Sequence, residues 1–311
     1  MKLTVRCGVH LVALGLGLGP WTAAHAEDSQ PKRAANQLRI GISTNIVRGV
    51  NENDARAAMR GWTDAFMRES PGDVEYTTVL ASPDDLTQAV RRHQVDAVAL
   101  TLPEYVLLKA LLDPKHVIVD MDRAKDGERY LILARADSNI RTPGDLKGRS
   151  LVVQDHSSTS LALAWLDTLL EGEGLSPKER LFSRLTMQDK LSRGVILPVF
   201  FRQADACLVT RRGFNAMAEL NPQVGRQLRA VATSPAVVPS VMTFHKDCPA
   251  RNREDFQNRL LSLFKGRIGD QMQTLFQSSR FTVTDASFLQ PSQDLLARAE
   301  RLKARTGSAG K

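Results

Sequence analysis

The sequence predicts an α/β protein with largely parallel sheets, divided into two lobes. Three observations lead to this prediction. Short strand-like runs alternate along the chain with runs of helical periodicity. A helix with clear start signals precedes the third of these strand-like runs. The 311 residues also exceed the roughly 100–200 residues of one domain, which favours two lobes.

The amino terminus is typical of an export signal and is not expected to belong to the fold. Lys2 and Arg6 give a basic start, an apolar run covers 9–18, and an Ala-His-Ala cleavage site ends at Ala26. The apolar run is shorter than the ~20 residues of a spanning helix. We therefore expect cleavage after Ala26, residues 27–36 as a disordered linker, and a periplasmic product. Removing residues 1–26 lowers the net charge from +8 to +6.

The predicted strands follow in order, and most are separated by helix-like segments. Before the third strand, Ser82 is expected as N-cap, Pro83 as the first helical residue and Asp85 as the partner in a capping box. From about Asp255 to Arg305 the pattern is mostly that of amphipathic helix. The nine predicted strands are 38–42, 74–80, 95–100, 116–120, 130–134, 150–154, 204–209, 228–232 and 240–244.

A run of hydroxyl side chains stands where the strand at 150–154 gives way to a helix: Ser157, Ser158, Thr159 and Ser160. A helix N-terminus exposes unpaired N–H groups and a partial positive charge, so hydroxyls there can help to bind an oxyanion. Serine and threonine also cap helices that bind nothing. Four in succession exceed what one cap requires.

Composition and motifs argue against several other classes of function. The positive charges are scattered and form no basic stripe with aromatic residues, so we expect no nucleic-acid partner. The histidines have no metal-ligand spacing and no Gly-x-Ser-x-Gly motif is present, so we expect neither an enzyme nor a bound metal or cofactor. Cys207 lies inside one strand-like run and Cys248 follows another, which favours two separate thiols over a disulfide.

Four segments together resemble the phosphonate/phosphite-binding branch of periplasmic solute-binding proteins. They are 95–108, 128–170, 197–209 and 228–249, and they extend over nearly all of residues 38 to 250. The resemblance implies the two-lobed type 2 periplasmic binding protein fold, in which each lobe is a mostly parallel sheet flanked by helices. Two crossovers join the lobes, and the ligand lies in the cleft. The implied lobes are 37–127 plus 240–311, and 128–239.

In this family a Ser-Thr-Ser turn grips the phosphonate oxygens, and Ser158, Thr159 and Ser160 match it. The resemblance therefore favours ligand contact over simple capping for the hydroxyl run, Ser157 included. Asp155 and His156, just ahead of it, are expected to shape the turn or to line the mouth of the cleft.

The chain also departs from the family pattern. A Gly-Pro-x-Ser-Tyr turn usually follows the third strand, but residues 101–105 read Thr-Leu-Pro-Glu-Tyr. Thr101, Glu104 and Tyr105 are the ligand candidates of this turn. Tyr105 matches, and it either hydrogen-bonds the oxyanion or is an ordinary surface tyrosine. Glu104 would repel an anion unless it turns outward or meets a donor on the ligand.

A second departure lies ahead of the strand at 204–209. The family commonly has a His-Glu pair thirteen and twelve residues before the aspartate of this strand. Counting back from Asp205 gives Ser192 and Arg193. Arg193 either holds a carboxylate or phosphate of the ligand or is a solvated helix residue. Asp205 itself matches the family and is either a ligand contact or structural.

The implied function is that of the periplasmic substrate-binding component of an ABC importer, which binds a small oxyanion such as a phosphonate, phosphite or phosphate. The alternative is a sensory adaptor of the same fold that signals to a membrane histidine kinase or cyclase. The expected partners are the oxyanion and either an inner-membrane ABC permease or the sensor kinase. We expect the protein to be a monomer.

Overall fold

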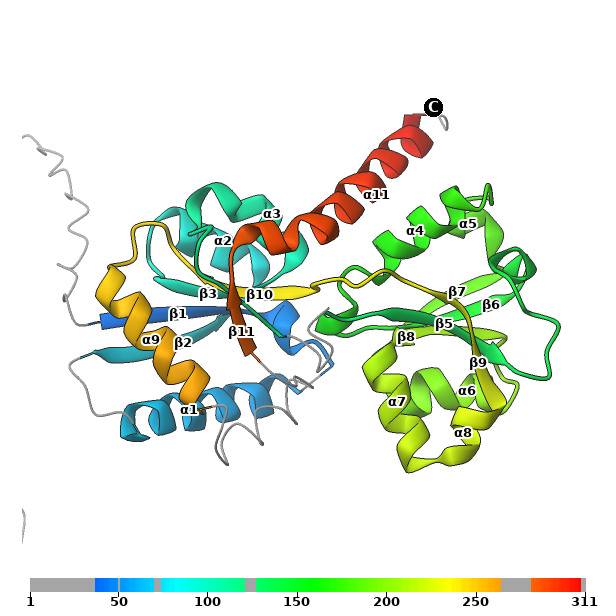
Figure 1. Ribbon diagram of the computed structural model, residues 1–311, viewed down its shortest axis with the longest axis horizontal. Coiled ribbons are helices and arrows are strands. Elements are labelled where there is room, and N and C mark those ends of the chain that lie inside the picture. The colour runs from blue at the N-terminus through cyan, green and yellow to red at the C-terminus, as the bar shows by residue number, and fades with distance from the viewer. Residues whose placement is uncertain (1–36, 50, 70–73, 121–126, 264–280, 309–311) are drawn as a thin grey trace, which may run out of the picture. The chain divides into compact units, whose positions relative to one another are not determined.

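The computed structural model describes residues 37–49, 51–69, 74–120, 127–263 and 281–308 (Figure 1). The predicted export signal and the linker at 27–36 lie outside these residues. Within the described part of the chain, no helix is both long enough and apolar enough to cross a membrane.

The first sheet has six strands in the order β11-β4-β10-β3-β1-β2. Four of them point the same way, and β10 enters antiparallel between β3 and β4. Helices α2 and α3 cover one face, and α1 and α9 cover the other (Figure 1). The strands are β1 (Gln37–Ser43), β2 (Glu75–Ala81), β3 (Ala97–Thr101), β4 (Val117–Asp120), β10 (Ser240–Phe244) and β11 (Phe281–Thr284). The helices are α1 (Glu52–Glu69), α2 (Pro83–Arg91), α3 (Leu102–Leu108) and α9 (Ala250–Leu263).

The second sheet has five strands in the order β7-β6-β8-β5-β9, and four of them point the same way. Helices α4 and α5 lie on one face, and α6, α7 and α8 lie on the other (Figure 1). The strands are β5 (Tyr130–Arg135), β6 (Ser150–Gln154), β7 (Arg184–Gln188), β8 (Ala206–Thr210) and β9 (Leu228–Thr233). The helices are α4 (Ala162–Gly172), α5 (Lys178–Leu181), α6 (Leu197–Phe200), α7 (Arg211–Leu220) and α8 (Pro222–Gln227).

The chain passes from the first sheet to the second after β4 and returns after β9. In each case the next strand, β5 or β10, enters its sheet antiparallel to its neighbours. We call the two connections between the sheets, from β4 to β5 and from β9 to β10, the passing segments. They pair through a β-bridge between Glu128 and Val237. Gly127 has a φ of +84°, and a Cβ at this position would lie 2.6 Å from the Val237 carbonyl oxygen, so only glycine fits here.

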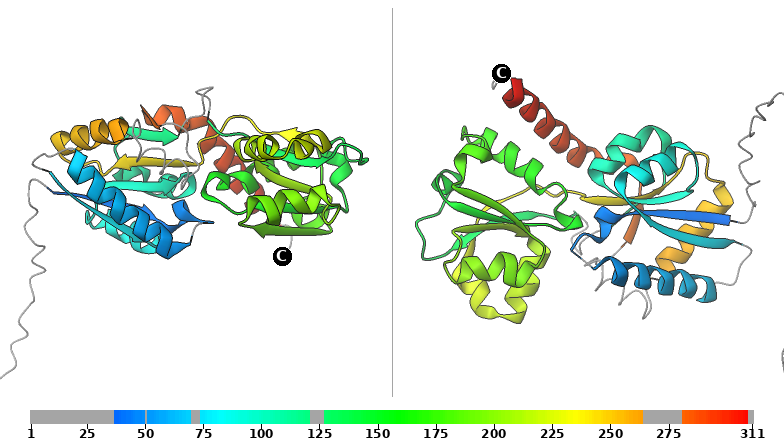
Figure 2. Two further views of the ribbon diagram at one scale, coloured as in Figure 1. Left: turned by 90° about the horizontal axis from the view of Figure 1, so that it is seen from below. Right: turned by 180° about the vertical axis from the view of Figure 1, so that it is seen from behind.

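A third connection is made by helix α11 (Gln290–Ser308) near the end of the chain. It follows β11 of the first sheet and packs against α4 of the second (Figure 2). Arg298 of α11 forms an ion pair with Glu171 of α4. The Ser292 hydroxyl accepts a hydrogen bond from the Val238 N–H at 2.8 Å, which fixes the start of α11 against the second passing segment.

The predicted fold class is confirmed, and all nine predicted strands are present with ends that differ by at most two residues. Ser82 caps α2 as predicted, and its hydroxyl accepts from the Asp85 N–H at 3.2 Å. Two strands were missed. Strand β7 is largely exposed and polar, and β11 interrupts the segment predicted as mostly helix between Asp255 and Arg305. The strands of the first sheet lie within 37–120 and 240–284, and those of the second lie within 130–233. The predicted boundaries of the lobes stay a prediction.

Candidate functional site

The hydroxyl run lies on a single 3-10 turn, Ser157–Thr159, which joins β6 to α4. Helix α4 starts only at Ala162, and Leu161 occupies its cap position without a side-chain hydrogen bond. The hydroxyls therefore precede the helix by one turn and do not belong to its first turn.

Two of the four hydroxyls are bonded to backbone groups of the protein. The Thr159 hydroxyl oxygen lies 2.7 Å from the Gln154 carbonyl and 2.8 Å from the His156 carbonyl, and it accepts the His156 N–H at 3.1 Å. The Ser160 hydroxyl donates to the Pro239 carbonyl at 2.6 Å. Both side chains hold the turn in place, which leaves the two earlier serines to face a cavity.

His156 is the cap of this turn. Its Nδ1 accepts the Ser158 N–H at 3.1 Å and lies 2.9 Å from the Ser158 hydroxyl. The side chain is buried, and this burial lowers the pKa of His156 to about 4, although the nearby Asp155 carboxylate opposes the shift. The imidazole is therefore neutral at physiological pH, with its proton on Nε2. His156 positions Ser158 and supplies no positive charge to a ligand.

Ser157 and Ser158 line a small polar pocket of about 40 Å³. The other residues that line this polar pocket come from the carboxyl end of β4, the passing segments, the start of α7 and the start of β10. They are Asp120, Glu128, Arg212, Pro239 and Ser240. The carboxyl ends of parallel strands meet at one edge of a sheet, which is where α/β proteins commonly bind ligands.

Arg212 is the cation of the polar pocket. Its Nη1 lies 2.7 Å from Asp120 Oδ2, and its Nε lies 3.6 Å from Glu128 Oε2. Burial raises the pKa of Glu128 above its usual range, although the Arg212 charge opposes this. Sequence reasoning missed Arg212, Asp120, Glu128 and Ser240. The Arg211-Arg212 pair shortly after the predicted strand at 204–209 is a signal that could have indicated Arg212.

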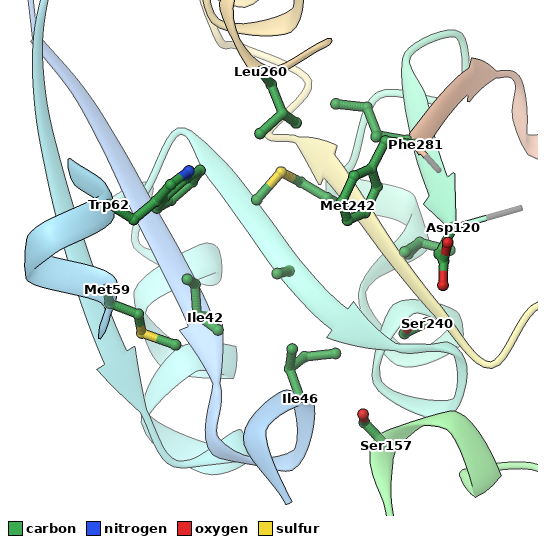
Figure 3. Close-up of a pocket in the computed structure, with 13 residues that line it drawn as sticks. Ile42, Ile46, Met59, Trp62, Asp120, Ser157, Ser240, Met242, Leu260 and Phe281 are labelled. Carbon is green, nitrogen blue, oxygen red and sulfur yellow. The ribbon is translucent and has the colours of Figure 1, made fainter. Parts of the chain in front are cut away.

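A second cavity of about 110 Å³ adjoins the polar pocket (Figure 3). Three residues line both: Asp120, Ser157 and Ser240. The other described residues of its lining are apolar: Ile42, Ile46, Met59, Trp62, Ala99, Ile118, Val241, Met242, Leu260 and Phe281. We call this the apolar cavity. Its lining comes from separate parts of the chain and carries no sequence motif.

The turn at 101–105 forms the start of α3 and lines neither cavity. Glu104 is buried, and its carboxylate accepts hydrogen bonds from the Ser43 hydroxyl (2.6 Å), the Asn45 amide (2.9 Å) and both the N–H and hydroxyl of Thr101 (2.8 Å each). It therefore turns inward and joins the ends of β1 and β3. Tyr105 is 2% exposed, and burial raises the pKa of its hydroxyl, so it is not a surface tyrosine.

Arg193 and Asp205 also lie outside both cavities. Arg193 is exposed on a π-helical turn, Leu191–Ile196. The Asp205 carboxylate accepts from the Ser150 N–H (2.8 Å) and hydroxyl (2.7 Å), which ties the start of β6 to the loop ahead of β8. This is the opposite end of β6 from the hydroxyl turn. The geometry gives Asp205 a structural role.

Among the described residues, two cysteines and a stacked pair of histidines lie away from both cavities. Cys207 and Cys248 are both buried and form no disulfide, as predicted, and burial raises the pKa of Cys207 to about 12. His93 and His245, far apart in sequence, stack with ring centroids 3.9 Å apart at 17°, with Asp247 beside them. Nitrogen lone pairs lie in the ring planes, so nearly parallel rings cannot both direct them at one ion about 2.0–2.1 Å away.

Comparison with known proteins agrees with this description. A family profile described as the periplasmic substrate-binding protein of phosphonate ABC transporters matches residues 48–288. A comparison with curated protein sequences found no match. Similar solved structures include a binding protein component of an ABC phosphonate transporter from Pseudomonas aeruginosa (15% identity, 86% of this chain and 87% of that one, TM-score 0.59).

Two further structures are similar over most of the chain. PhnD1 from Prochlorococcus marinus in complex with methylphosphonate is 14% identical over 86% of this chain and 99% of that one, with a TM-score of 0.61. The aliphatic sulphonate binding protein SsuA from Escherichia coli is 15% identical over 86% and 94%, with a TM-score of 0.53. The fold is that of a type 2 periplasmic binding protein.

The chain belongs to the periplasmic substrate-binding family of phosphonate ABC transporters, since the profile matches most of its length. This family is a periplasmic transport component and not a family of enzymes.

Proposed function

We propose that this protein binds a small phosphonate-like oxyanion in the polar pocket and delivers it to the permease of an ABC importer. The observation that supports this most directly is the grouping of the Arg212 guanidinium with the hydroxyls of Ser157, Ser158 and Ser240. A guanidinium and hydroxyl donors are the groups that recognise oxyanions through short, charge-assisted hydrogen bonds. The small volume of the pocket suits one such group.

The two carboxylates of the pocket restrict which oxyanion fits. Asp120 and Glu128 flank Arg212, so a fully ionised ligand would meet negative charge as well as positive charge. A phosphate-type group has a second pKa of about 6, so a fraction of it still carries a proton near pH 7. That O–H can donate to Asp120 or Glu128. A sulfonate has no proton to donate and is expected to bind less well.

The binding test is calorimetric titration of the exported protein with methylphosphonate, phosphite, phosphate and methanesulfonate. We expect at least one of the phosphorus oxyanions to bind and methanesulfonate to bind at least tenfold more weakly. Arg212→Gln should weaken binding by tenfold or more, because a hydrogen bond to a charged group contributes ~1.5–3 kcal/mol. Arg211→Gln is the matched control, since Arg211 is adjacent in sequence and lines neither cavity.

Unchanged melting of both variants without ligand shows that the fold is intact. If no phosphorus oxyanion binds to the wild type, or if Arg211→Gln weakens binding as much as Arg212→Gln, the assignment of the pocket is wrong. The proposed export is tested separately by amino-terminal sequencing of periplasmic protein. This sequence should begin at Glu27, and a retained Met1 would contradict cleavage after Ala26.

A further inference from the structure

The apolar part of the cavity in Figure 3 lies between the first sheet and the helices α1 and α9, and Ser157 of the hydroxyl turn reaches its polar end. Trp62 and Met59 project from α1, Leu260 from α9, and Met242 and Phe281 from β10 and β11 (Figure 3). These side chains converge on one space from four separate elements. Met59, Trp62 and Leu260 are almost completely buried, so their positions are fixed by core packing.

Among the described lining residues, the carboxylate and hydroxyl groups lie at one end of the cavity. They belong to Asp120, Ser157 and Ser240, and the same three residues line the polar pocket. Figure 3 shows their oxygen atoms at the side of the cavity away from Trp62 and Leu260. The two spaces therefore form a continuous site with a polar end and an apolar end.

An apolar space of this size, partly open to its surroundings, exceeds the gaps that are usual in protein packing. Interiors pack to the density of organic crystals and contain few voids larger than a water molecule. Water is also poorly held at the apolar end of such a space, because it needs two to four polar partners and the described side chains there are almost entirely aliphatic, aromatic or thioether. The thioethers of Met59 and Met242 can adapt to a flexible apolar guest.

We propose that the ligand is an amphiphile, a phosphonate-type oxyanion whose alkyl or aryl substituent fills the apolar cavity. This proposal rests on the proposed function of the polar pocket as the site of the oxyanion. An engineered apolar cavity of roughly 150 Å³ holds benzene. The cavity of about 110 Å³ therefore suits a substituent of about four to six carbon atoms.

The test is calorimetric titration with methyl-, butyl-, hexyl- and decylphosphonate. Affinity should rise about fourfold for each methylene that enters the cavity, since each contributes ~0.8 kcal/mol, and the rise should stop near six carbons. The heat capacity change of binding should become more negative along the same series, because more apolar surface leaves water.

Two substitutions test the cavity itself. Ala99→Leu places a larger side chain in the cavity, so it should remove the gain in affinity that comes with chain length. Met242→Ala enlarges the cavity and should move the plateau to longer chains, which keeps the test decisive if Ala99→Leu does not fold. Met67→Ala is the matched control, since Met67 is a partly exposed methionine of α1 outside the cavity.

Equal affinity for methyl- and hexylphosphonate would overturn the amphiphile proposal and leave the oxyanion site intact. An unchanged plateau in Met242→Ala would also overturn it. Failure of every phosphonate to bind, methylphosphonate included, would instead defeat the proposed function and the amphiphile proposal with it.

Discussion

Replacing His156 by asparagine should remove a large part of the acid sensitivity of this protein. The imidazole is 6% exposed, and its pKa falls from 6.5 to about 4 because burial disfavours the charged form. Asparagine can still accept the Ser158 N–H, as it does at many helix caps. The substitution therefore keeps the capping bond and removes the titration.

The direction and size follow from proton linkage. Between pH 6.5 and about 4 the unfolded chain binds a proton at this histidine and the folded protein does not, so stability falls as pH falls. A pKa difference of one corresponds to about 1.4 kcal/mol. The wild type should therefore lose about 3 kcal/mol from this group between pH 7.5 and pH 4, on top of the losses shared with the variant.

The measurement is urea unfolding of both proteins at half-unit steps from pH 4 to pH 7.5. The difference between their free energies of unfolding should change by about 3 kcal/mol in favour of the variant at low pH. Subtraction cancels the other titrating groups. If the two pH profiles run parallel, His156 is not held neutral by burial and our account of the turn is wrong.

Three further outcomes are expected. Thr159→Val should lower the free energy of unfolding by ~1–3 kcal/mol in urea titrations, because buried backbone groups lose their hydrogen-bond partner. Ser157→Ala should change it by under ~0.5 kcal/mol, and equal effects of the two substitutions would contradict the hydrogen-bond assignment. Cys207 and Cys248 should resist an aromatic disulfide reagent in the folded protein and react fully in denaturant. Rapid labelling of the folded protein would show that these thiols are not buried. Gly127→Ala should reduce the melting temperature by several degrees, since the φ of Gly127 is positive and the Val237 carbonyl blocks the added methyl group. An unchanged melting temperature would show that the backbone of the passing segments can shift to accommodate the methyl group.

Most of the sheet framework was predictable because the information is local. Buried strands are near-continuous runs of aliphatic residues, and β3, β6 and β8 are of this kind. Strand β7 lies at the edge of its sheet and is largely exposed, so it has no such run. Strand β11 has only four residues and was lost in an amphipathic segment.

The site was predictable only where it is contiguous in sequence. The hydroxyl turn was found because its four residues are adjacent. The sequence could not show that Thr159 and Ser160 bond to backbone carbonyls while Ser157 and Ser158 face a cavity, since that depends on the turn type and on a segment about 80 residues further on.

The roles of the charged residues also depend on contacts that only the tertiary structure creates. The sequence suggested that Glu104 would repel an anion, but its carboxylate accepts hydrogen bonds from the ends of β1 and β3 and from the 3-10 turn after β1. Arg193 was located by counting along a pattern, and counting cannot detect that a π-helical turn leaves its side chain exposed. Arg212 acquires its partners from segments more than 80 residues earlier, which only the chain topology brings to one place.

The contact between α11 and α4 bears on how the protein unfolds. Two passing segments and this helix link the two sheets, and α11, which follows β11 of the first sheet, covers part of α4 on the second. Loss of structure in the second sheet would expose the apolar side of α11, and loss of α11 would uncover α4. Such mutual dependence makes partly folded states costly, and we expect the described part of the chain to unfold in a single cooperative transition.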